Sequence, residues 1–291
     1  MKRGPVHAAL WASLIATAGG LVACSQPPTG ASDPWPGGAE DAGAPSGWTL
    51  SWSDEFNGPQ GSAVDPSKWA FDVGGNGWGN QELEYYTSGT ENAVVGGGAL
   101  TITAAAAPSS PSLSCWYGAC RYTSARLNTL GRFSQEYGRF EARIRTPTGP
   151  GMWPAFWLLG ENVDQVGWPA CGEVDIMENA GASPNVNHGS LHSPGSAQMT
   201  ATFQSPTSLA DDFHVYAVDW SPDGIWFYVD DTLYETQQAA DYPPSEWPFA
   251  QPFFVILDVA VGGTFDGPPD TATTFPQSMA VDYVRVYSQN R

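Results

Sequence analysis

The chain has 291 residues, of which 42% are hydrophobic and 13% aromatic, and its formal net charge is -19. A surface this acidic repels phosphate backbones and anionic lipids, so nucleic acid is not an expected partner, whereas a neutral polymer such as a polysaccharide is compatible with it. The 33 glycines and 25 prolines, with the many aromatic residues, are typical of an all-β protein with many turns.

Residues 1–23 have the pattern of a signal peptide of the lipoprotein type. Two basic residues precede an apolar stretch at 8–18, which is too short for a membrane span of about 20 residues. The sequence Leu-Val-Ala-Cys at 21–24 resembles the lipobox of bacterial lipoproteins, in which the cysteine is lipidated after cleavage. The alternative is an ordinary signal peptide and an incidental Cys24. We therefore expect an exported protein of the bacterial cell envelope, anchored to the membrane through Cys24 or secreted.

Residues 24–46 are rich in Pro, Gly, Ser, Ala and Asp and contain few apolar side chains. Such a segment cannot bury enough surface to offset the entropy of ordering it, so it is predicted to be a flexible linker. One folded domain is expected over 47–291, as a monomer. In an exported chain, Cys115 and Cys120 are close enough to form a disulfide around a small loop, and Cys171 is predicted to be a buried small hydrophobe.

Short strands separated by turn residues are predicted from Trp48 to the C-terminus. The segment 137–145 alternates, with Phe140, Ala142 and Ile144 on one face, and 153–159 is almost continuously apolar. Further strands are predicted at 213–220, 226–229, 253–259 and 279–287. Because no long segment has helical periodicity, the pattern predicts a β-sandwich or barrel.

The segment 172–179 places three carboxyl groups, Glu173, Asp175 and Glu178, among strand-forming residues. On a regular strand Glu173 and Asp175 share a face and Glu178 lies on the other, but one β-bulge around 176–177 would bring all three together. Two carboxyls with different pKa values, roughly 5 Å apart, are what a retaining glycosidase needs. A solvated acidic strand edge would show the same spacing.

Several motifs in one order resemble glycoside hydrolase family 16, close to the bacterial laminarinases, which are endo-β-1,3-glucanases. The resemblance covers nearly all of residues 48–288, and its motifs lie at 52–56, 80–83, 122–126, 151–157, 168–169, 172–178, 213–217 and 281–287. It implies a β-jelly-roll sandwich of two curved antiparallel sheets with a substrate cleft across the concave face.

The resemblance also implies roles for the three acids. Glu173 matches the nucleophile, Glu178 the general acid/base, and Asp175 a carboxyl that hydrogen-bonds near the nucleophile and tunes it. Three close carboxyls cannot all ionise cheaply, so their repulsion is expected to retain a proton in the site. No cofactor is expected for the reaction. The extra residue Met177 resembles the bulged strand of laminarinases, agarases and carrageenases rather than that of lichenases.

The expected activity is therefore retaining endo-hydrolysis of β-1,3-glucosidic bonds in laminarin-like β-glucans through a covalent glycosyl-enzyme. The alternatives are a mixed-linkage β-1,3-1,4-glucanase, an agarase-like galactan hydrolase, a transglycosylase, and a non-catalytic glucan-binding protein on the same sandwich. The presence of all three acids favours an enzyme over a binding protein.

Six further residues are candidates for substrate binding. Asn80, Glu82 and Arg126 match family positions that bind sugar hydroxyls, and Trp153 and Trp168 are expected to stack on sugar rings. His192 is placed either at the cleft or in a structural role, and Trp157 either at the cleft or in the core.

The resemblance further implies a structural calcium, with Glu55, the carbonyl of Gly98 and Asp282 as ligands. Oxygen ligands far apart in the sequence suit a hard cation that ties the two ends of the chain together. Asp258 departs from the family pattern, in which Asn is common at that position. We expect it to add a fourth carboxyl near the cleft and to shift the pH optimum.

Overall fold

The computed structural model describes residues 44–109, 113–195 and 199–290. The predicted signal peptide, Cys24 and nearly all of the predicted linker lie outside these residues, so their predictions are not addressed by the structure. Among the described residues, no helix has the length and apolar character that crossing a membrane requires.

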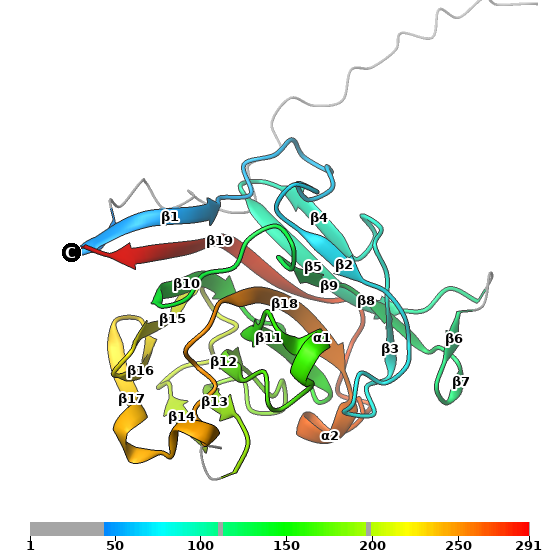
Figure 1. Ribbon diagram of the computed structural model, residues 1–291. Coiled ribbons are helices and arrows are strands. Elements are labelled where there is room, and N and C mark those ends of the chain that lie inside the picture. The colour runs from blue at the N-terminus through cyan, green and yellow to red at the C-terminus, as the bar shows by residue number, and fades with distance from the viewer. Residues whose placement is uncertain (1–43, 110–112, 196–198, 291) are drawn as a thin grey trace, which may run out of the picture. The chain divides into compact units, whose positions relative to one another are not determined.

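The first of two large sheets has ten strands in the described part of the chain (Figure 1). Their order is β17 (Thr232–Gln238), β16 (Gly224–Val229), β15 (His214–Ser221), β10 (Gly138–Arg145), β19 (Gln277–Gln289), β5 (Ala99–Ala106), β8 (Tyr122–Ser124) and β3 (Glu84–Tyr86). In addition, β1 (Trp48–Asp54) pairs with β19 and β4 (Ala93–Gly96) with β5. The pairing is antiparallel except between β3 and β8, which run parallel.

The second sheet has seven antiparallel strands among the described residues. Their order is β14 (Met199–Gln204), β13 (Val186–His192), β12 (Glu173–Glu178), β11 (Met152–Gly160), β18 (Phe253–Val261), β9 (Arg126–Asn128) and β2 (Ala70–Asp72). The strands predicted at 137–145, 153–159, 213–220, 226–229, 253–259 and 279–287 are all present, most of them a residue or two longer or shifted.

Helices are short and few in the described part. They are α1 (Val163–Val166), α2 (Gly263–Asp266), and the 3-10 turns η1 (Ala239–Asp241) and η2 (Pro244–Glu246). A separate hairpin of β6 (Ser114–Cys115) and β7 (Gly118–Ala119) projects beside β3 (Figure 1). The predicted disulfide between Cys115 and Cys120 closes this hairpin, and Cys171 is a free, fully buried cysteine, as predicted.

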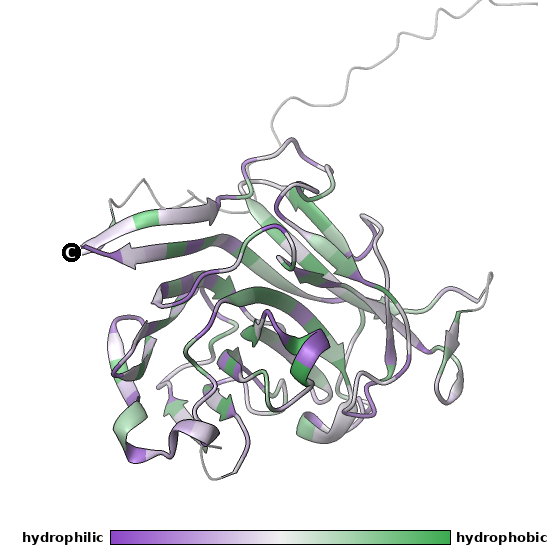
Figure 2. Ribbon diagram, viewed as in Figure 1, coloured by the Kyte–Doolittle hydropathy of each residue, from purple (hydrophilic) through white to green (hydrophobic). Residues whose placement is uncertain are grey.

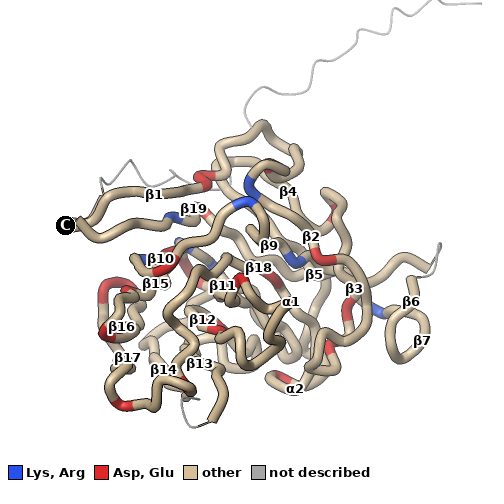
Figure 3. The backbone as a smooth tube through the Cα atoms, viewed as in Figure 1, with Lys and Arg blue, Asp and Glu red and all other residues tan. Residues whose placement is uncertain are grey.

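The core lies between the two sheets and consists of the residues on their facing sides. On β10 these are Phe140, Ala142 and Ile144, all 0% exposed, which confirms the face predicted from the alternation. Hydrophobic residues gather on central strands such as β5 and β18 (Figure 2). Acidic residues are spread along the chain while basic ones are few (Figure 3), consistent with the net charge. The prediction of an all-β sandwich of two large sheets is confirmed.

Candidate active site

A cleft of about 590 Å³ crosses the outer face of the seven-stranded sheet. On β11 the alternation of side chains decides what faces it: Trp153 and Trp157 line the cleft, whereas Phe156 and Leu158 are buried in the core. The remaining walls come from β9, β12, β13, β14 and β18, the loop around Asn80, Trp168 and α2. From the sequence, Trp157 could have been either at the cleft or in the core; the structure places it at the cleft.

A β-bulge in β12 brings the three acids to this cleft. In the pairing with β11, Met177 lies opposite Phe156 and Asp175 opposite Trp157, so Ile176 is the extra residue. The pairing with β13 shifts at the same place. Ile176 and its neighbour Met177 are both buried in the core, which returns Glu178 to the cleft side with the other two acids. The bulge predicted around residues 176–177 is confirmed, but its extra residue is Ile176 rather than Met177, which is paired with Phe156.

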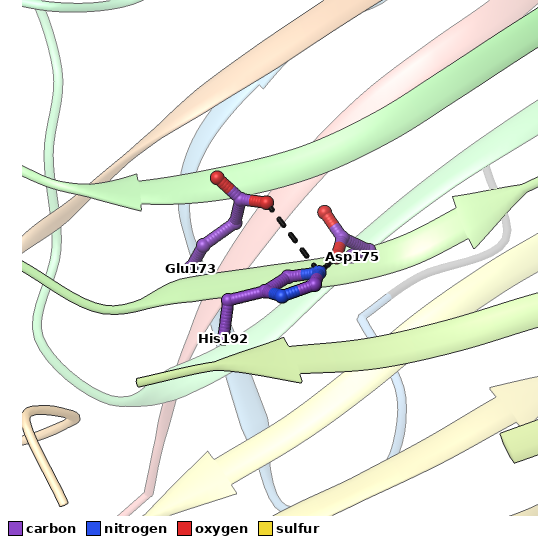
Figure 4. Close-up of side chains that lie close together, drawn as sticks. All are labelled: Glu173, Asp175 and His192. Atoms are coloured by element: carbon purple, nitrogen blue, oxygen red, sulfur yellow. Dashed lines mark ion pairs between the residues drawn. The ribbon is translucent and has the colours of Figure 1, made fainter. Parts of the chain in front are cut away.

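Glu173, Asp175 and His192 form a tight cluster across β12 and β13 (Figure 4). The imidazole Nε2 lies 3.1 Å from Oδ2 of Asp175 and 3.7 Å from Oε1 of Glu173. One potential ligand atom from each residue lies within 4.8 Å of the other two. Of the two roles open to His192, the structure therefore places it at the cleft beside the acids.

Glu178 lies at the other end of the bulged strand and is 8% exposed. Its Oε1 accepts a 2.9 Å hydrogen bond from Nε1 of Trp153, and its Oε2 accepts a 3.5 Å bond from the hydroxyl of Ser190. Trp153 therefore contacts one of the candidate catalytic acids directly, while its ring stacks on Phe265 of α2 at 5.0 Å.

Burial and mutual repulsion keep protons in this cluster. Desolvation, followed by the charge of Asp258, raises the pKa of Asp175 to about 8. Desolvation and the charge of Asp175 raise the pKa of Glu178 to about 8, against the hydrogen bond from Trp153. The same two causes raise the pKa of Glu173, while the charges of His192 and Arg126 lower it. At neutral pH these raised pKa values keep protons in the cluster, which supplies the acid that glycoside cleavage requires.

Asp258 lies on β18 at the floor of the cleft, and is only 5% exposed. Its Oδ1 accepts a 2.7 Å hydrogen bond from Nε1 of Trp157, and its Oδ2 lies 3.2 Å from the hydroxyl of Tyr86. The same hydroxyl lies 3.0 Å from Oε2 of Glu82. Burial and the charge of Asp258 raise the pKa of Glu82 to about 7. The fourth carboxyl expected at this position is present in the cleft.

Arg126 is held between two aromatic rings at the cleft wall. Its guanidinium carbon lies 4.7 Å from the ring centre of Trp157 and 5.0 Å from that of Trp78, and its Nε donates to Asp72 at 3.0 Å. Nearby, Nδ2 of Asn80 donates a 3.1 Å hydrogen bond to Oε1 of Glu82. Asn80, Glu82 and Arg126 thus line one continuous stretch of the cleft.

Comparison with known proteins agrees with this geometry. The family model of glycosyl hydrolases family 16 matches residues 80–285. The chain belongs to this family. It is 45% identical over 256 residues to a β-glucanase of Rhodothermus marinus, a match that covers 82% of this chain and 85% of the relative. It is 36% identical over 265 residues to a glucan endo-1,3-β-glucosidase of Cryptopygus antarcticus, covering 84% and 93% of the two chains.

Solved structures show the same fold for family 16 relatives. The laminarinase catalytic domain of Thermotoga maritima superposes with a TM-score of 0.77 at 42% identity, covering 84% of this chain and 99% of that one. The laminarinase of Rhodothermus marinus gives 0.75 at 43% identity, covering 84% and 98%. The predicted jelly-roll sandwich is thereby confirmed. Glycoside hydrolases of family 16 need no cofactor for the reaction.

Trp168 is the most exposed aromatic residue of this family 16 cleft, with 57% of its surface accessible. Its ring lies 5.9 Å from the imidazole of His192. An exposed indole beside the acid cluster offers a flat apolar face to a sugar ring.

Two aromatic residues that line the cleft were not anticipated, Trp78 and Phe265. Trp78 belongs to a loop whose sequence, Gly-Gly-Asn-Gly-Trp-Gly at 74–79, is a visible signal for a tightly turned loop around one aromatic side chain. Phe265 is the third residue of the four-residue helix α2, and nothing in the local pattern distinguishes it from a core phenylalanine.

Glu55, Gly98 and Asp282, the residues proposed for calcium, are not among the residues that line the cleft, and the two acids have other partners. Both carboxylate oxygens of Glu55 accept hydrogen bonds from Arg285, at 3.0 and 2.7 Å. Oδ2 of Asp282 accepts one of 2.7 Å from Arg143. With their charges already paired with arginine, the two carboxylates as arranged do not fit a calcium held by their side chains.

Proposed function

We propose that this family 16 protein is a retaining endo-hydrolase of β-1,3-glucosidic bonds in laminarin-like glucans. The observation that carries the proposal is the bulge at Ile176, which places Glu173, Asp175 and Glu178 together on the floor of a cleft. Relatives named laminarinase or endo-1,3-β-glucosidase, at 36–43% identity, support the β-1,3 linkage.

The first chemical step needs one ionised and one protonated carboxyl. The carboxylate of Glu173 attacks the anomeric carbon while Glu178 gives its proton to the departing glycosidic oxygen, leaving a glycosyl ester on Glu173. Burial raises the pKa of Glu178 to about 8, so this group carries a proton at neutral pH. Burial and the charge of Asp175 raise the pKa of Glu173, and the charges of His192 and Arg126 offset part of this rise, which favours the ionised form of the nucleophile.

The second step returns both acids to their starting states. The Glu178 carboxylate takes a proton from a water molecule as the water oxygen attacks the anomeric carbon, and Glu173 leaves as a carboxylate. Two displacements on the same carbon retain the β configuration. A sugar hydroxyl in place of water would give transglycosylation by the same step.

Asp175 lies between the two catalytic acids on the strand, and His192 contacts its Oδ2 at 3.1 Å. Because burial and the charge of Asp258 raise its pKa to about 8, Asp175 is protonated at neutral pH. A neutral carboxyl there offers a hydrogen-bond donor near the nucleophile without adding a second negative charge. This supports the tuning role proposed for it.

The aromatic residues of the cleft are proposed to bind the glucan. Trp153, Trp157 and Trp168 offer indole faces along the cleft, and Asn80, Glu82 and Arg126 offer polar groups for sugar hydroxyls.

Mixed-linkage glucan and galactans are the alternative substrates, and a glucan-binding protein without catalysis is the alternative class.

Reducing-sugar release by the purified protein from laminarin, curdlan, lichenan and agarose tests these possibilities together. We expect release from laminarin that is abolished by Glu173→Gln and unchanged by Glu91→Gln, a matched control at an exposed loop position. Faster release from lichenan or agarose would move the assignment to that polysaccharide. Binding of laminarin with no cleavage of any substrate would establish the non-catalytic alternative.

We also propose that the protein is a monomer of the bacterial cell envelope, held there by lipid on Cys24. The signal and lipobox patterns of residues 1–24 support this proposal. In cells fed a labelled fatty acid, the wild-type chain is expected to carry label and fractionate with membranes. The Cys24→Ala chain is expected to lose both properties, and an unlabelled, soluble wild-type chain would contradict the anchor. Light scattering after gel filtration tests the monomer.

The structural calcium implied by the family pattern is retained as a proposal with its own test. The resemblance at Glu55, Gly98 and Asp282 supports it. The hydrogen bonds from Arg285 and Arg143 to the two acids disfavour it, because they occupy carboxylate oxygens that would bind the ion. If calcium is bound, treatment with a chelator lowers the melting temperature, and added calcium restores it. A melting temperature unaffected by either treatment would show that the arginine pairs replace the ion.

A further inference from the structure

One cleft loop, residues 74–83, has hydrogen bonds of its own, such as that from Nε1 of Trp78 to the carbonyl of Gly74, but it also holds two residues in an unfavourable backbone conformation. Trp78 and Gln81 are not glycine, yet their φ angles are 48° and 60°. Left-handed conformations of such residues persist only where the surroundings hold them in place. The loop supplies Trp78, Asn80 and Glu82 to the cleft, so its conformation decides where these groups meet the substrate.

The disulfide hairpin, residues 114–120, holds the loop from outside. The backbone N–H of Trp116 donates a 2.8 Å hydrogen bond to the carbonyl of Gly75, and its Nε1 donates one of 2.7 Å to the carbonyl of Glu82. The hydroxyl of Tyr117 donates to the carbonyl of Leu83 at 2.5 Å. Three donors at the hairpin tip therefore bind carbonyls at both ends of the loop.

The hairpin also packs closely on the loop between these bonds. A Cβ atom on Gly77 would lie 2.9 Å from the indole of Trp116, and one on Gly75 would lie 2.5 Å from Sγ of Cys115. Only glycine allows the two backbones to approach this closely. Trp116 and Tyr117 lie between the two cysteines, so the disulfide restricts the segment that carries all three donors.

We propose that the disulfide hairpin is a positioning element of the active site. It holds loop 74–83 so that Trp78 and Asn80 bind the glucan, and it makes substrate affinity depend on the Cys115–Cys120 bond. Trp116 is the main positioning residue, because it provides two of the three hydrogen bonds to the loop. The inference rests on the proposed function, since its readout is glucan hydrolysis.

A dithiol reductant can break the disulfide that holds this hairpin. It transfers two electrons to the disulfide, the S–S bond breaks, each sulfur takes up a proton, and the reductant becomes a disulfide itself. Cys120 is half-buried and the adjoining tip residue Trp116 is 50% exposed, so the bond is within reach of a small reductant. Cys171 is fully buried, so new accessible thiols report on the hairpin.

Steady-state kinetics on laminarin test the proposal with three variants. Trp116→Phe keeps a ring but removes the Nε1 donor, Tyr117→Phe removes the donor to Leu83, and Cys115→Ser with Cys120→Ser removes the disulfide. We expect KM to rise about five- to tenfold, with kcat within about twofold of wild type, because positioning hydrogen bonds are lost while the acids are untouched. Tyr228→Phe, a hydroxyl deletion on β16 outside the cleft, is the matched control, and its KM should not change.

Reduction of the wild-type protein with dithiothreitol should reproduce the rise in KM, and reoxidation with oxidised glutathione should reverse it. Unchanged KM in all three variants and after reduction, in a wild-type protein that cleaves laminarin, would overturn the inference. So would a fall in kcat alone. If the wild-type protein cleaves no glucan, the proposed function itself fails, which is a different result. Melting curves show whether each variant is folded at the assay temperature.

Discussion

His192 Nε2 lies 3.1 Å from Oδ2 of Asp175, and the same nitrogen lies 3.7 Å from Oε1 of Glu173. A residue of β13 therefore supplies a positive charge to two acids of β12 whenever its imidazole is protonated. This pairing offsets part of the cost of burying several carboxyls together, and it acts on the group that must be ionised.

Replacing His192 with Gln should make the nucleophile Glu173 harder to ionise. The charge of His192 lowers the pKa of Glu173 against burial and against Asp175, so its removal raises that pKa. The acidic limb of kcat/KM then moves to higher pH, and at pH 5 we expect activity lower by about an order of magnitude. His214→Gln, on β15 of the ten-stranded sheet, breaks the contact with Asp230 and is the control. An acidic limb that does not move would show that His192 has no electrostatic role.

Asp258→Asn should shift the opposite limb of the pH profile. Asn keeps an acceptor for Nε1 of Trp157 but removes a negative charge that, after burial and Asp175, raises the pKa of Glu178. The pKa of Glu178 falls, the acid loses its proton at lower pH, and the basic limb of kcat/KM moves to lower pH. Profiles of the two proteins that coincide would mean that Asp258 is uncharged throughout the working range.

Removing Glu178 should stabilise the fold in alkaline solution. Its pKa is raised from 4.5 to about 8, so the folded protein holds this proton more tightly than the unfolded chain does. Stability is therefore lost as pH rises between these values, because ionisation in the cleft is costly. Glu178→Gln removes that cost, and its melting temperature should exceed that of wild type at pH 9 but barely at pH 5. Each kcal/mol removed corresponds to about 2–4 °C. Equal melting temperatures at pH 9 would contradict this account.

The same variant tests the role of Glu178 as the acid. Glu178→Gln should cleave laminarin about 10²- to 10⁴-fold more slowly, because the leaving oxygen receives no proton. An aryl glucoside with an acidic phenol needs little protonation, so its first step should be much less affected. Equal losses on both substrates would argue against this assignment.

Part of the active-site geometry on β12 could be predicted from the sequence. Alternation places Glu173 and Asp175 on one face, and only a bulge brings Glu178 to the same face, so the spacing itself predicts an irregularity at 176–177. It does not decide between Met177, the expected extra residue, and Ile176, which is the extra residue in the structure. Along β11 the same alternation puts Trp153 and Trp157 on one face. It does not say whether that face is the core or the cleft, because both accept indole rings.

Other features depend on contacts that no local pattern contains. Asp258 and Tyr86 are 172 residues apart and meet only because the fold brings a residue of β3 against β18. The arginine partners of Glu55 and Asp282 lie on strands paired across the first sheet, so the charge balance at the expected calcium position could not be read from the acids alone. The contacts of the disulfide hairpin with loop 74–83 are likewise set by tertiary packing.

The stereochemistry of laminarin cleavage distinguishes a double displacement at Glu173 from a single displacement by water. Proton NMR spectra taken in the first minutes, before mutarotation, should show new reducing ends in the β configuration, and none should form with Glu173→Gln. Reducing ends that appear first as the α anomer would contradict a double displacement at Glu173.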